Sequence, residues 1–505
     1  MLSQLPRHSG RLAPLTPFRD VLAFTPVTDR LHIAHVTPEM VPFLKTGGLA
    51  DVSAALPKAL VRLGHRVTVV LPRHAGVPFP PGDFVGSADV PLDGVHRSAG
   101  FHRTRTAGGV DVVFVEYPLF YDRTAPYGHD DDRLRYAFLA RAALEYFRRS
   151  GDRPDVIHAH DWQAGLVPVY LKASYWEDPV LRRIPSVFTI HNVAYQGRFG
   201  LDTLGLLGLP PHLGADFALE YHGGVSYLKG GTVFAEMVST VSPTYALEIQ
   251  GPEHGFGFEH VMRSRAEDTV GILNGVDYDE WDPWNDPHIA RRYSPRHVGG
   301  QAGCKADLLR AFGLPEEPDL PVVAGISRLV WQKGFDLVAE AWWDLLRRPM
   351  RMLILGTGDP AVQAGLADLA RRDPGRFAVH FAYDEALAHR VMAGADIFLM
   401  PSRSEPCGLT QMYALRYGTV PLVRSTGGLA DTVEPYDAAN GRGTGFRFEH
   451  ADGTGLVWAL DQALTTQADP AAWRGLMRRG MTRDFSWDRS AREYEGLYQR
   501  ALRQV

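Results

Sequence analysis

The chain has 505 residues, a formal net charge of −5, 45% hydrophobic residues and 22% charged residues. This length exceeds what one hydrophobic core usually supports, so two or three domains are expected, and the slight acidity argues against a nucleic-acid partner. No apolar run approaches the ~18 residues that a membrane span needs. The two cysteines, Cys304 and Cys407, form no CxxC motif, which favours a reducing, cytoplasmic location over a disulfide framework.

Residues 1–30 are rich in Pro and basic residues and lack the apolar segment of a secretory signal. We interpret them as a disordered extension, or as the result of a start codon set too far upstream, with a transit peptide as the alternative. Because no burial pattern precedes Leu31, a chain that begins at Arg30 is expected to match the full chain in activity and melting temperature.

The first half of the chain contains short apolar runs and one clearly amphipathic segment. The pattern predicts a βαβ unit, in which a helix over 49–63 ends at Gly64 and lies between strands 31–37 and 66–71. Further elements are strands at 155–160, 186–190, 237–243 and 270–276, followed by an irregular segment with tryptophans at 279–286.

After a short helix at 305–312, strands and helices alternate closely. The predicted strands are 322–326, 351–355, 377–382, 397–400, 420–423 and 444–448. The predicted helices are 335–347, 361–371, 385–394, 409–417, one that opens at Thr426, 453–466, 470–482 and a terminal one that includes Trp487. Strands of about five apolar residues between helices are typical of a doubly wound parallel sheet.

Residues 397–433 contain the same arrangement twice: a short apolar strand, a polar loop and the start of a helix. In open α/β sheets, ligands bind at the carboxyl ends of the strands, where unpaired helix N–H groups point toward anionic oxygen. Glu405 lies in the first of these loops, beside such N–H groups, and as an anion it is a poor partner for a phosphate. It fits better as an acceptor for the hydroxyls of a sugar attached to a phosphate.

Two segments of the chain resemble the bacterial glycogen synthases and plastid starch synthases. They are SRSEPCGLTQMYALRYGTVPLVRSTGGLADTV at 402–433 and VTPEMVPFLKTGGLADV at 36–52, and further matches extend the resemblance over roughly 31–505. The members of this family are retaining glycosyltransferases of the GT-B architecture. The resemblance therefore implies an α/β fold with two Rossmann-like, doubly wound parallel-sheet domains that face a central cleft.

The resemblance also divides the chain. The acceptor-side domain is expected to span 31–278 and to be completed by a C-terminal helix at 487–505. The nucleotide-sugar domain is expected to span 279–486, and residues 1–30 lie outside both.

The reaction that the resemblance implies is transfer of α-glucose from ADP-glucose to the non-reducing 4-hydroxyl of an α-1,4-glucan such as glycogen. It would proceed with retention and without a cofactor or a metal. The alternatives are a UDP-glucose-using GT-B glucosyltransferase, a GT-B phosphorylase with pyridoxal phosphate, a metal-dependent hydrolase and a non-catalytic glucan-binding protein. The residues leave open a double displacement through Asp161 or Glu405, whereas the family implies that attack and departure share one face of the sugar.

Two loops at predicted strand ends carry cations suited to a diphosphate. Lys45, Gly47 and Gly48 belong to KTGGLADV, which is similar to the donor-binding motif of the family. Arg328 and Lys333 lie in SRLVWQKG, which is similar to the family's SRLxxQKG, and they are expected to clamp the diphosphate.

Two other strand ends carry histidines. His158 and His160 alternate, so both point to one face of the sheet, and with Asp161 they form a usable set of metal ligands. No second ligand cluster follows, and the resemblance implies instead that Asp161 and Trp162 are acceptor-side groups. His191, in HNVAYQG, matches the family's IHNxAYQG motif, in which the carbonyl and the ring of the histidine lie against the donor glucose. A structural histidine is the alternative.

The resemblance thus implies catalytic roles for Glu405, His191, Asp161, Arg328 and Lys333. It implies substrate contacts for Lys45, Gly47, Gly48, Asp51, Asn274, Tyr383, Cys407, Gly408, Leu409, Thr410, Gly427 and Gly428. Asp51 has an alternative role as a charge at a helix N-terminus, Asn274 is expected at the domain junction, and Tyr383 is expected to stack on the base or ribose. Many GT-B relatives carry a second Glu where this chain has Tyr413, so ribose recognition is unexplained.

The segment TGGLAD occurs twice, at 46–51 and 426–431. In each copy two glycines allow the backbone to approach a ligand, and the next helical turn offers free N–H groups. We expect the two copies to face each other across the cleft and to hold the sugar-diphosphate end of the donor when the domains close. Chance recurrence of a common helix start is the alternative.

Overall fold

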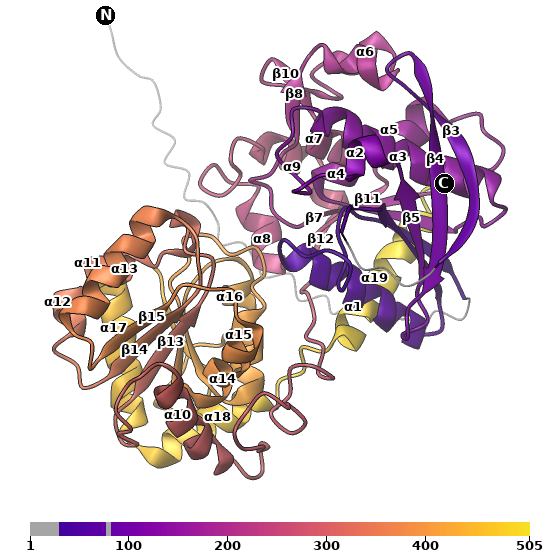
Figure 1. Ribbon diagram of the computed structural model, residues 1–505. Coiled ribbons are helices and arrows are strands. Elements are labelled where there is room, and N and C mark those ends of the chain that lie inside the picture. Colours follow the sequence, from indigo (N-terminus) through magenta and orange to yellow (C-terminus); the bar gives the residue numbers. More distant parts are fainter. Residues whose placement is uncertain (1–29, 77–81) are drawn as a thin grey trace, which may run out of the picture.

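The computed structural model describes residues 30–76 and 82–505 of the chain (Figure 1). These residues form two large sheets, of nine and six strands, and a small sheet of three strands. We call the nine-stranded sheet and the helices that cover it the first lobe, and the six-stranded sheet and its helices the second lobe. The predictions made for residues 1–29 concern a part of the chain that lies outside the described residues.

The first lobe is built on a mostly parallel sheet. Its strands are β1 (His32–Val36), β2 (Arg66–Pro72), β3 (Asp83–Leu92), β4 (Val95–Arg105), β5 (Asp111–Glu116), β6 (Val156–His160), β7 (Ser186–Ile190), β11 (Met237–Thr240) and β12 (Thr269–Gly271). They lie in the order β12-β11-β7-β6-β1-β2-β5-β4-β3, and all neighbours from β12 to β5 are parallel. Strand β4 is antiparallel to both β5 and β3.

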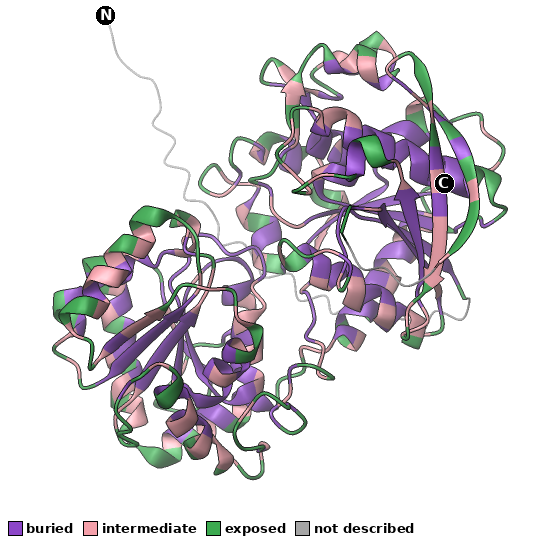
Figure 2. Ribbon diagram, in the orientation of Figure 1, coloured by how far each residue is buried: buried purple, intermediate pink, exposed green. Residues whose placement is uncertain are grey.

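Helices cover both faces of this sheet, as Figure 1 shows. They are α1 (Gly48–Arg62), α2 (Pro118–Tyr121), α3 (Asp132–Arg149), α4 (Asp161–Ala164), α5 (Leu166–Ala173), α6 (Thr203–Leu207), α7 (Tyr227–Phe234), α8 (Pro243–Glu248) and α9 (Glu259–Ser264). The small antiparallel sheet consists of β8 (Arg198–Gly200), β9 (Glu220–Tyr221) and β10 (Gly224–Ser226). The strands at the centre of both large sheets are buried (Figure 2).

The second lobe is a parallel sheet. Its strands are β13 (Val322–Ile326), β14 (Arg351–Leu355), β15 (Phe377–His380), β16 (Ile397–Met400), β17 (Val420–Arg424) and β18 (Phe446–Phe448), in the order β15-β14-β13-β16-β17-β18. Counted along the chain this is the order 3-2-1-4-5-6 of the Rossmann fold. Its helices are α10 (Gly300–Ala311), α11 (Asp336–Glu340), α12 (Trp342–Leu345), α13 (Pro360–Arg372), α14 (Glu385–Gly394), α15 (Thr410–Tyr417), α16 (Gly427–Thr432), α17 (Gly453–Gln467) and α18 (Pro470–Met481).

Both sheets reverse their strand order at one point, between β1 and β6 in the first lobe and between β13 and β16 in the second. Such a switch point opens a crevice at the carboxyl ends of the two strands, and ligands of α/β sheets bind there. The loops that follow these four strands therefore mark the expected site. They carry Lys45, Asp161, Lys333 and Glu405.

The last helix of the chain, α19 (Trp487–Leu502), returns to the first lobe. It packs on α1, and Trp487, Tyr494 and Tyr498 are buried in one cluster with residues of β1 and β2. In Figure 1 this yellow helix lies beside the indigo α1, away from the other yellow helices. The two crossings between the lobes pair with each other, because the N–H of Val276 donates to the carbonyl of Phe485 at 2.7 Å. We propose that the boundary between the two domains lies between residues 278 and 279.

Most predicted elements are confirmed, and the fold class with them. The prediction of one continuous helix at 335–347 is wrong, because the helix breaks at Ala341. The break places Trp342 in the core against Phe377 and leaves Trp343 exposed. Helix α10 begins five residues before the predicted start at 305. The antiparallel pair β3–β4 was not predicted, because its strands are largely exposed and carry no continuous apolar run.

No helix in the described part of the chain is both long enough and apolar enough to cross a membrane.

Candidate active site

The loop after β16 holds a buried ion pair. Lys333 Nζ donates to both carboxylate oxygens of Glu405, at 2.7 and 2.6 Å, and the Ser402 hydroxyl donates to Glu405 Oε2 at 3.0 Å. The Glu405 residue is 6% exposed. The sequence placed Glu405 beside helix N–H donors, but the partners of its carboxylate in the structure are this lysine and this hydroxyl.

Arg328 differs from Lys333 although both lie in the loop after β13. Its side chain is exposed and has no partner among the described residues. An arginine without a partner at a strand end is free to meet an anionic ligand, and its planar fork suits a phosphate. Arg403, in the loop after β16, is engaged: it donates to both carboxylate oxygens of Asp336, at 2.7 and 2.8 Å.

The loop after β1 places a second ion pair on the first lobe. Lys45 Nζ lies 2.8 Å from Asp51 Oδ1. Burial lowers the pKa of Lys45, but Asp51 outweighs this effect and the pKa is raised, so the lysine stays charged. Glu39, which the sequence analysis did not single out, accepts from the N–H and the hydroxyl of Thr46 at 2.6 and 2.7 Å and so holds this loop in place.

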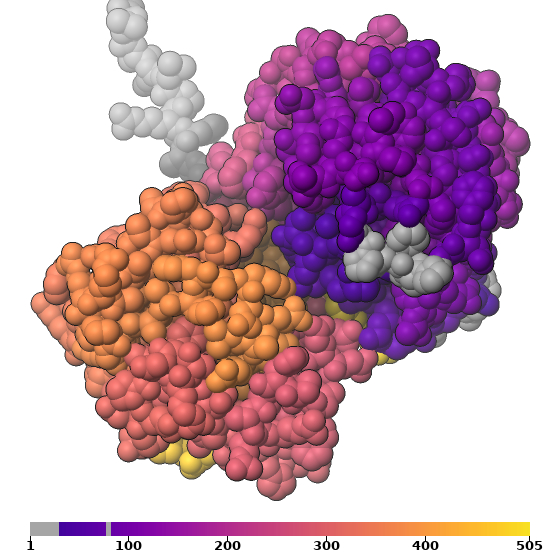
Figure 3. Space-filling view, in the orientation of Figure 1, coloured from indigo at the N-terminus to yellow at the C-terminus, as the bar shows by residue number. Residues whose placement is uncertain are grey.

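The two lobes approach each other at these loops. A side-chain carbon placed on Gly48 would lie 3.9 Å from Leu409 Cδ1 of the second lobe. In Figure 3 the orange surface of the second lobe lies opposite the indigo surface of the first lobe across a recess. Tyr383 is exposed at this side, and its hydroxyl donates to Glu385 Oε2 at 3.2 Å.

Direct hydrogen bonds also join the lobes at both ends of α8. The Ser242 hydroxyl donates to the carbonyl of Pro406 at 2.7 Å. Thr244 donates to the Asp431 carboxylate through its N–H at 2.9 Å and its hydroxyl at 2.6 Å. The N–H of Gly427 donates to Glu248 Oε1 at 3.0 Å.

The two TGGLAD copies therefore do not face each other directly. Gly48 is exposed, whereas Gly427 and Gly428 are buried behind the loop at 405–409. A side-chain carbon on Gly428 would lie 2.1 Å from the carbonyl oxygen of Cys407. The second copy packs behind the loop at 405–409. Two residues of this loop, Cys407 and Leu409, therefore lie between the copies, with Cys407 against Gly428 and Leu409 near Gly48.

Valine at these two glycines is expected to act differently. Gly48→Val has room, so the variant should fold and bind ADP but lose transfer, since the side chain stands between the lobes. Gly428→Val must displace the Cys407 backbone and should lower the melting temperature as well as ADP binding. Thermal unfolding, ADP titration and transfer assays separate the two, with Gly365→Val in α13 as the control, because a side-chain carbon there meets nothing within 4 Å and Gly365 is not a predicted site residue. Transfer at the wild-type rate by Gly48→Val would contradict the assignment.

Cys407 and Asn274 meet where the lobes join. The backbone of Asn274 is hydrogen-bonded to the Cys407 thiol. Burial raises the pKa of this thiol to about 12, although the bond from Asn274 opposes the shift. Cys407 is therefore a neutral group near pH 7 and serves as packing and as a hydrogen-bond partner, not as a nucleophile.

Asp161 and His191 lie side by side at the ends of β6 and β7. Asp161 Oδ1 accepts from the N–H of His191 at 2.7 Å, and Asp161 has a left-handed φ of 54°. Burial raises the pKa of Asp161 to about 7, against the opposing bonds from the N–H groups of His191 and Asn192. Trp162 packs edge-on against Tyr136, with ring centroids 5.0 Å apart.

Asp161→Asn is expected to change how stability depends on pH. The folded chain holds the proton of Asp161 up to a pKa of about 7, against an ordinary value of 3.8, so this group stabilises the fold at low pH. Its contribution falls by about 1.4 kcal/mol per pH unit as the pH rises between these values. The asparagine can keep the bond to His191 and the left-handed backbone. Urea unfolding of both proteins from pH 5 to pH 8 measures this; parallel profiles would contradict it.

Two groups of side chains have the spacing of metal ligands in the described part of the chain: His35 with His158 and His160, and Glu280 with Glu385 and His389. In the first group both nitrogens of His158 are already hydrogen-bonded. In the second, burial and the neighbouring Glu385 raise the pKa of Glu280 to about 7.

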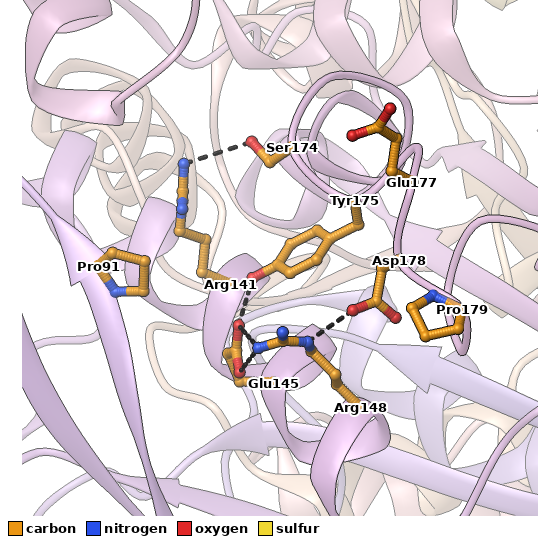
Figure 4. A pocket seen from close by; sticks show the side chains of 9 residues that line it. All are labelled: Pro91, Arg141, Glu145, Arg148, Ser174, Tyr175, Glu177, Asp178 and Pro179. Atoms are coloured by element: carbon orange, nitrogen blue, oxygen red, sulfur yellow. Dashed lines mark hydrogen bonds and ion pairs between the residues drawn. The ribbon is translucent and has the colours of Figure 1, made fainter.

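A pocket of about 440 Å³ lies in the first lobe, away from the strand ends (Figure 4). Several of its side chains bond to one another: Arg148 Nε donates to Asp178 at 2.7 Å, and the Tyr175 hydroxyl donates to Glu145 at 2.8 Å. Arg141 Nε is buried without a hydrogen-bond partner in the described part of the chain. None of the predicted site residues lines it. Arg328 and the Lys333–Glu405 pair lie at the strand ends and not in this pocket.

The structure thus gathers most of the predicted residues at one place. The sequence analysis did not identify Glu39, Ser402 and Ser242. Each of these residues forms hydrogen bonds that orient a loop, and none of them places a charged group in the recess. The first two lie inside the segments that carry the family resemblance, so their position there was the available signal. Ser242 lies outside those segments and has no signal of its own.

Comparisons with known proteins agree with this arrangement. A family model described as the starch synthase catalytic domain matches residues 32–264, and one for group 1 glycosyl transferases matches residues 310–475. The catalytic domain of starch synthase IV from Arabidopsis thaliana, bound to ADP and acarbose, is 34% identical to this chain. The two structures superpose with a TM-score of 0.87, and the match covers 94% of this chain and 100% of that chain. A sucrose-phosphate synthase from Thermosynechococcus elongatus, 18% identical, has a TM-score of 0.59 with the same coverages. The fold and the strand-end site define a GT-B glycosyltransferase.

The sequence relatives narrow this class. A glycogen synthase from Koribacter versatilis is 47% identical over 93% of this chain and 98% of its own length. A glycogen synthase from an Anaeromyxobacter species is 46% identical over 93% of this chain and 99% of its own length. The chain belongs to the glycogen synthase family.

Proposed function

We propose that the chain uses ADP-glucose as donor and extends the non-reducing 4-hydroxyl of an α-1,4-glucan with retention of configuration. The observation that carries this proposal is the pairing, at one strand end, of a buried carboxylate with a lysine whose loop also carries Arg328, an exposed arginine without a side-chain partner among the described residues. One carboxylate for sugar hydroxyls and cations for a diphosphate are what a nucleotide sugar needs. The related starch synthase IV with bound ADP and acarbose supports the same classes of donor and acceptor.

Lys333 serves two partners in this proposal. An ammonium group has three N–H donors, and two of them are used on the two oxygens of Glu405. The third remains for a phosphate oxygen of the donor. Lys333 therefore fixes the position of the sugar-binding carboxylate relative to the leaving group, and Arg328 and Lys45 add the remaining positive charge.

The chemical step follows from this placement. Negative charge develops on the departing diphosphate, and the three cations stabilise it without a change of their own protonation. Glu405 accepts hydrogen bonds from hydroxyls of the glucosyl group and so holds the anomeric carbon of this group in place. His191 and Asp161 lie on the opposite lobe, where the backbone of His191 is fixed by the bond to Asp161 and its carbonyl is a neighbour for the positive glucosyl centre.

The donor is tested by offering ADP-glucose and UDP-glucose separately with a glycogen primer, each with and without EDTA. We expect faster turnover with ADP-glucose and no effect of EDTA. Equal or faster turnover with UDP-glucose would overturn the choice of donor, and loss of activity with EDTA would overturn the metal-free step. We also propose a cytoplasmic location, which the unpaired thiols of Cys304 and Cys407 support.

A further inference from the structure

A cluster of four histidines fills the strand ends of the first lobe behind the recess. His35 comes from β1, His158 and His160 from β6, and His191 directly follows β7. The first three are fully buried, and the rings of His35 and His160 stack with centroids 5.2 Å apart and an angle of 11°. So many buried imidazoles are unusual unless their nitrogens are hydrogen-bonded.

Three of these rings form one hydrogen-bonded row. His35 Nδ1 lies 2.9 Å from His160 Nε2, and His160 Nδ1 lies 3.0 Å from His191 Nε2. At the inner end, His35 Nε2 is buried and has no partner in the described ranges of the chain. At the outer end His191 is half-buried, and its Nδ1 is not among the buried atoms that lack a partner. The row therefore leads from a sealed end to an open one.

His158 touches this row but does not belong to it. Its Nδ1 lies 2.9 Å from the Tyr498 hydroxyl and its Nε2 lies 2.5 Å from the Thr189 hydroxyl. Both nitrogens are thus occupied, which leaves His158 without a lone pair for a metal shared with His35 and His160. The cluster is a hydrogen-bonded structure and not a vacant ligand set.

The protons in the row can be arranged in only two ways. Burial lowers the pKa of His35, His160 and His191 far below pH 7, so each ring is neutral and carries one N–H. In the first arrangement each ring is protonated on Nδ1, and every N–H points toward His191 and out of the row. In the second each ring is protonated on Nε2, and every N–H points toward His35 and inward.

The sealed end decides between them. In the second arrangement the buried N–H of His35 Nε2 would have no acceptor, and orphaned buried N–H groups are rare. In the first arrangement His35 Nε2 carries a lone pair instead of a proton, and the row ends in the accessible Nδ1–H of His191. We infer that His35 and His160 are positioning residues that hold the His191 ring with its Nδ1–H as a hydrogen-bond donor toward the bound sugar. This inference rests on the proposed function for the identity of the ligand.

Histidine nitrogen shifts measure the arrangement without any substrate. In the full chain, labelled with nitrogen-15 at histidine, two-bond and three-bond correlations distinguish the two tautomers of each ring. We expect the Nδ1–H form, the one that free histidine populates less in water, at His35, His160 and His191. The Nε2–H form at His191 would overturn the inference. Absence of glucosyl transfer would overturn the proposed function instead and would leave the tautomers unchanged.

Leucine at two neighbouring positions tests the role in the reaction. His160→Leu and His158→Leu each remove a fully buried histidine from the same strand, so both should lose similar stability. Only His160→Leu should lower kcat, by about tenfold for one lost hydrogen bond, with the KM for donor little changed. His160→Asn, whose amide can donate to His191 Nε2, should recover part of kcat. Equal kcat in the two leucine variants, or no recovery with asparagine, would overturn the inference.

Discussion

Glu405→Gln is expected to lose transfer by about a hundred- to a thousandfold, the usual effect of removing one preorganised electrostatic partner in an active site. Three physical changes combine. The sugar hydroxyls lose a charged acceptor, Lys333 loses its counter-ion, and the new amide group turns an N–H toward the ammonium. ADP binding should change only a few-fold, because Glu405 contacts the sugar and not the phosphates in the proposed complex.

Transfer rates at saturating donor, ADP titration and thermal unfolding together measure this outcome. Ser402→Ala is the matched control, because it removes only the 3.0 Å bond from the Ser402 hydroxyl to Glu405. That variant should keep its rate within about tenfold of the wild type. Normal transfer by Glu405→Gln would make Glu405 a structural residue, and a chain that no longer folds would do the same.

Arg328→Ala and Lys333→Ala are each expected to weaken ADP binding by about ten- to a hundredfold, the effect of one charge-assisted hydrogen bond. Their effects on stability should differ. The Arg328 side chain has no partner within residues 30–76 and 82–505, so its loss should leave the fold unchanged. Loss of Lys333 leaves the carboxylate of Glu405 buried without a counter-ion, and breaking a buried pair in this way destabilises a fold strongly.

Inhibition by ADP and the melting temperature of each variant test this pair of expectations. Arg403→Ala is the control for a nearby arginine, since Arg403 is bound to Asp336 and faces the Trp331 ring at 4.9 Å. It should lower the melting temperature and leave ADP inhibition intact. Unchanged ADP inhibition in both Arg328→Ala and Lys333→Ala would remove the diphosphate assignment from these residues.

The second lobe was largely predictable because its sequence is regular. Strands such as Val322–Ile326 and Ile397–Met400 are buried on both faces and consist of apolar residues, so the pattern alone marks them. The first lobe was less so. Its hairpin of β3 and β4 has no continuous apolar run. The alternation of buried residues at Ala88, Val90 and Leu92 covers only half of β3 and is too short to identify a strand.

The site shows a similar division. The strand ends identify Lys333 and Glu405 as residues near a ligand, but nothing in their spacing of 72 positions says that they form a pair. The burial of Gly428 against Cys407 could not be predicted from the sequence either, because a Gly-Gly helix start has the same sequence pattern whether it binds a ligand or packs against a loop. Contacts between distant segments depend on how the two sheets pack, and a local pattern does not contain that.

The position of α19 sets an order for the synthesis of this protein. The helix is made after both sheets, yet it packs on α1, one of the first elements made, and it contacts β6, β7 and β11 of the first sheet. It also supplies Trp487, Tyr494 and Tyr498 to the hydrophobic cluster that includes residues of β1 and β2. A growing chain on the ribosome can close the second sheet before it can close the first. The part of the protein that is made first therefore keeps apolar surface exposed until α19 emerges, and a chain cut before α19 leaves the first lobe, not the second lobe, without part of its hydrophobic core.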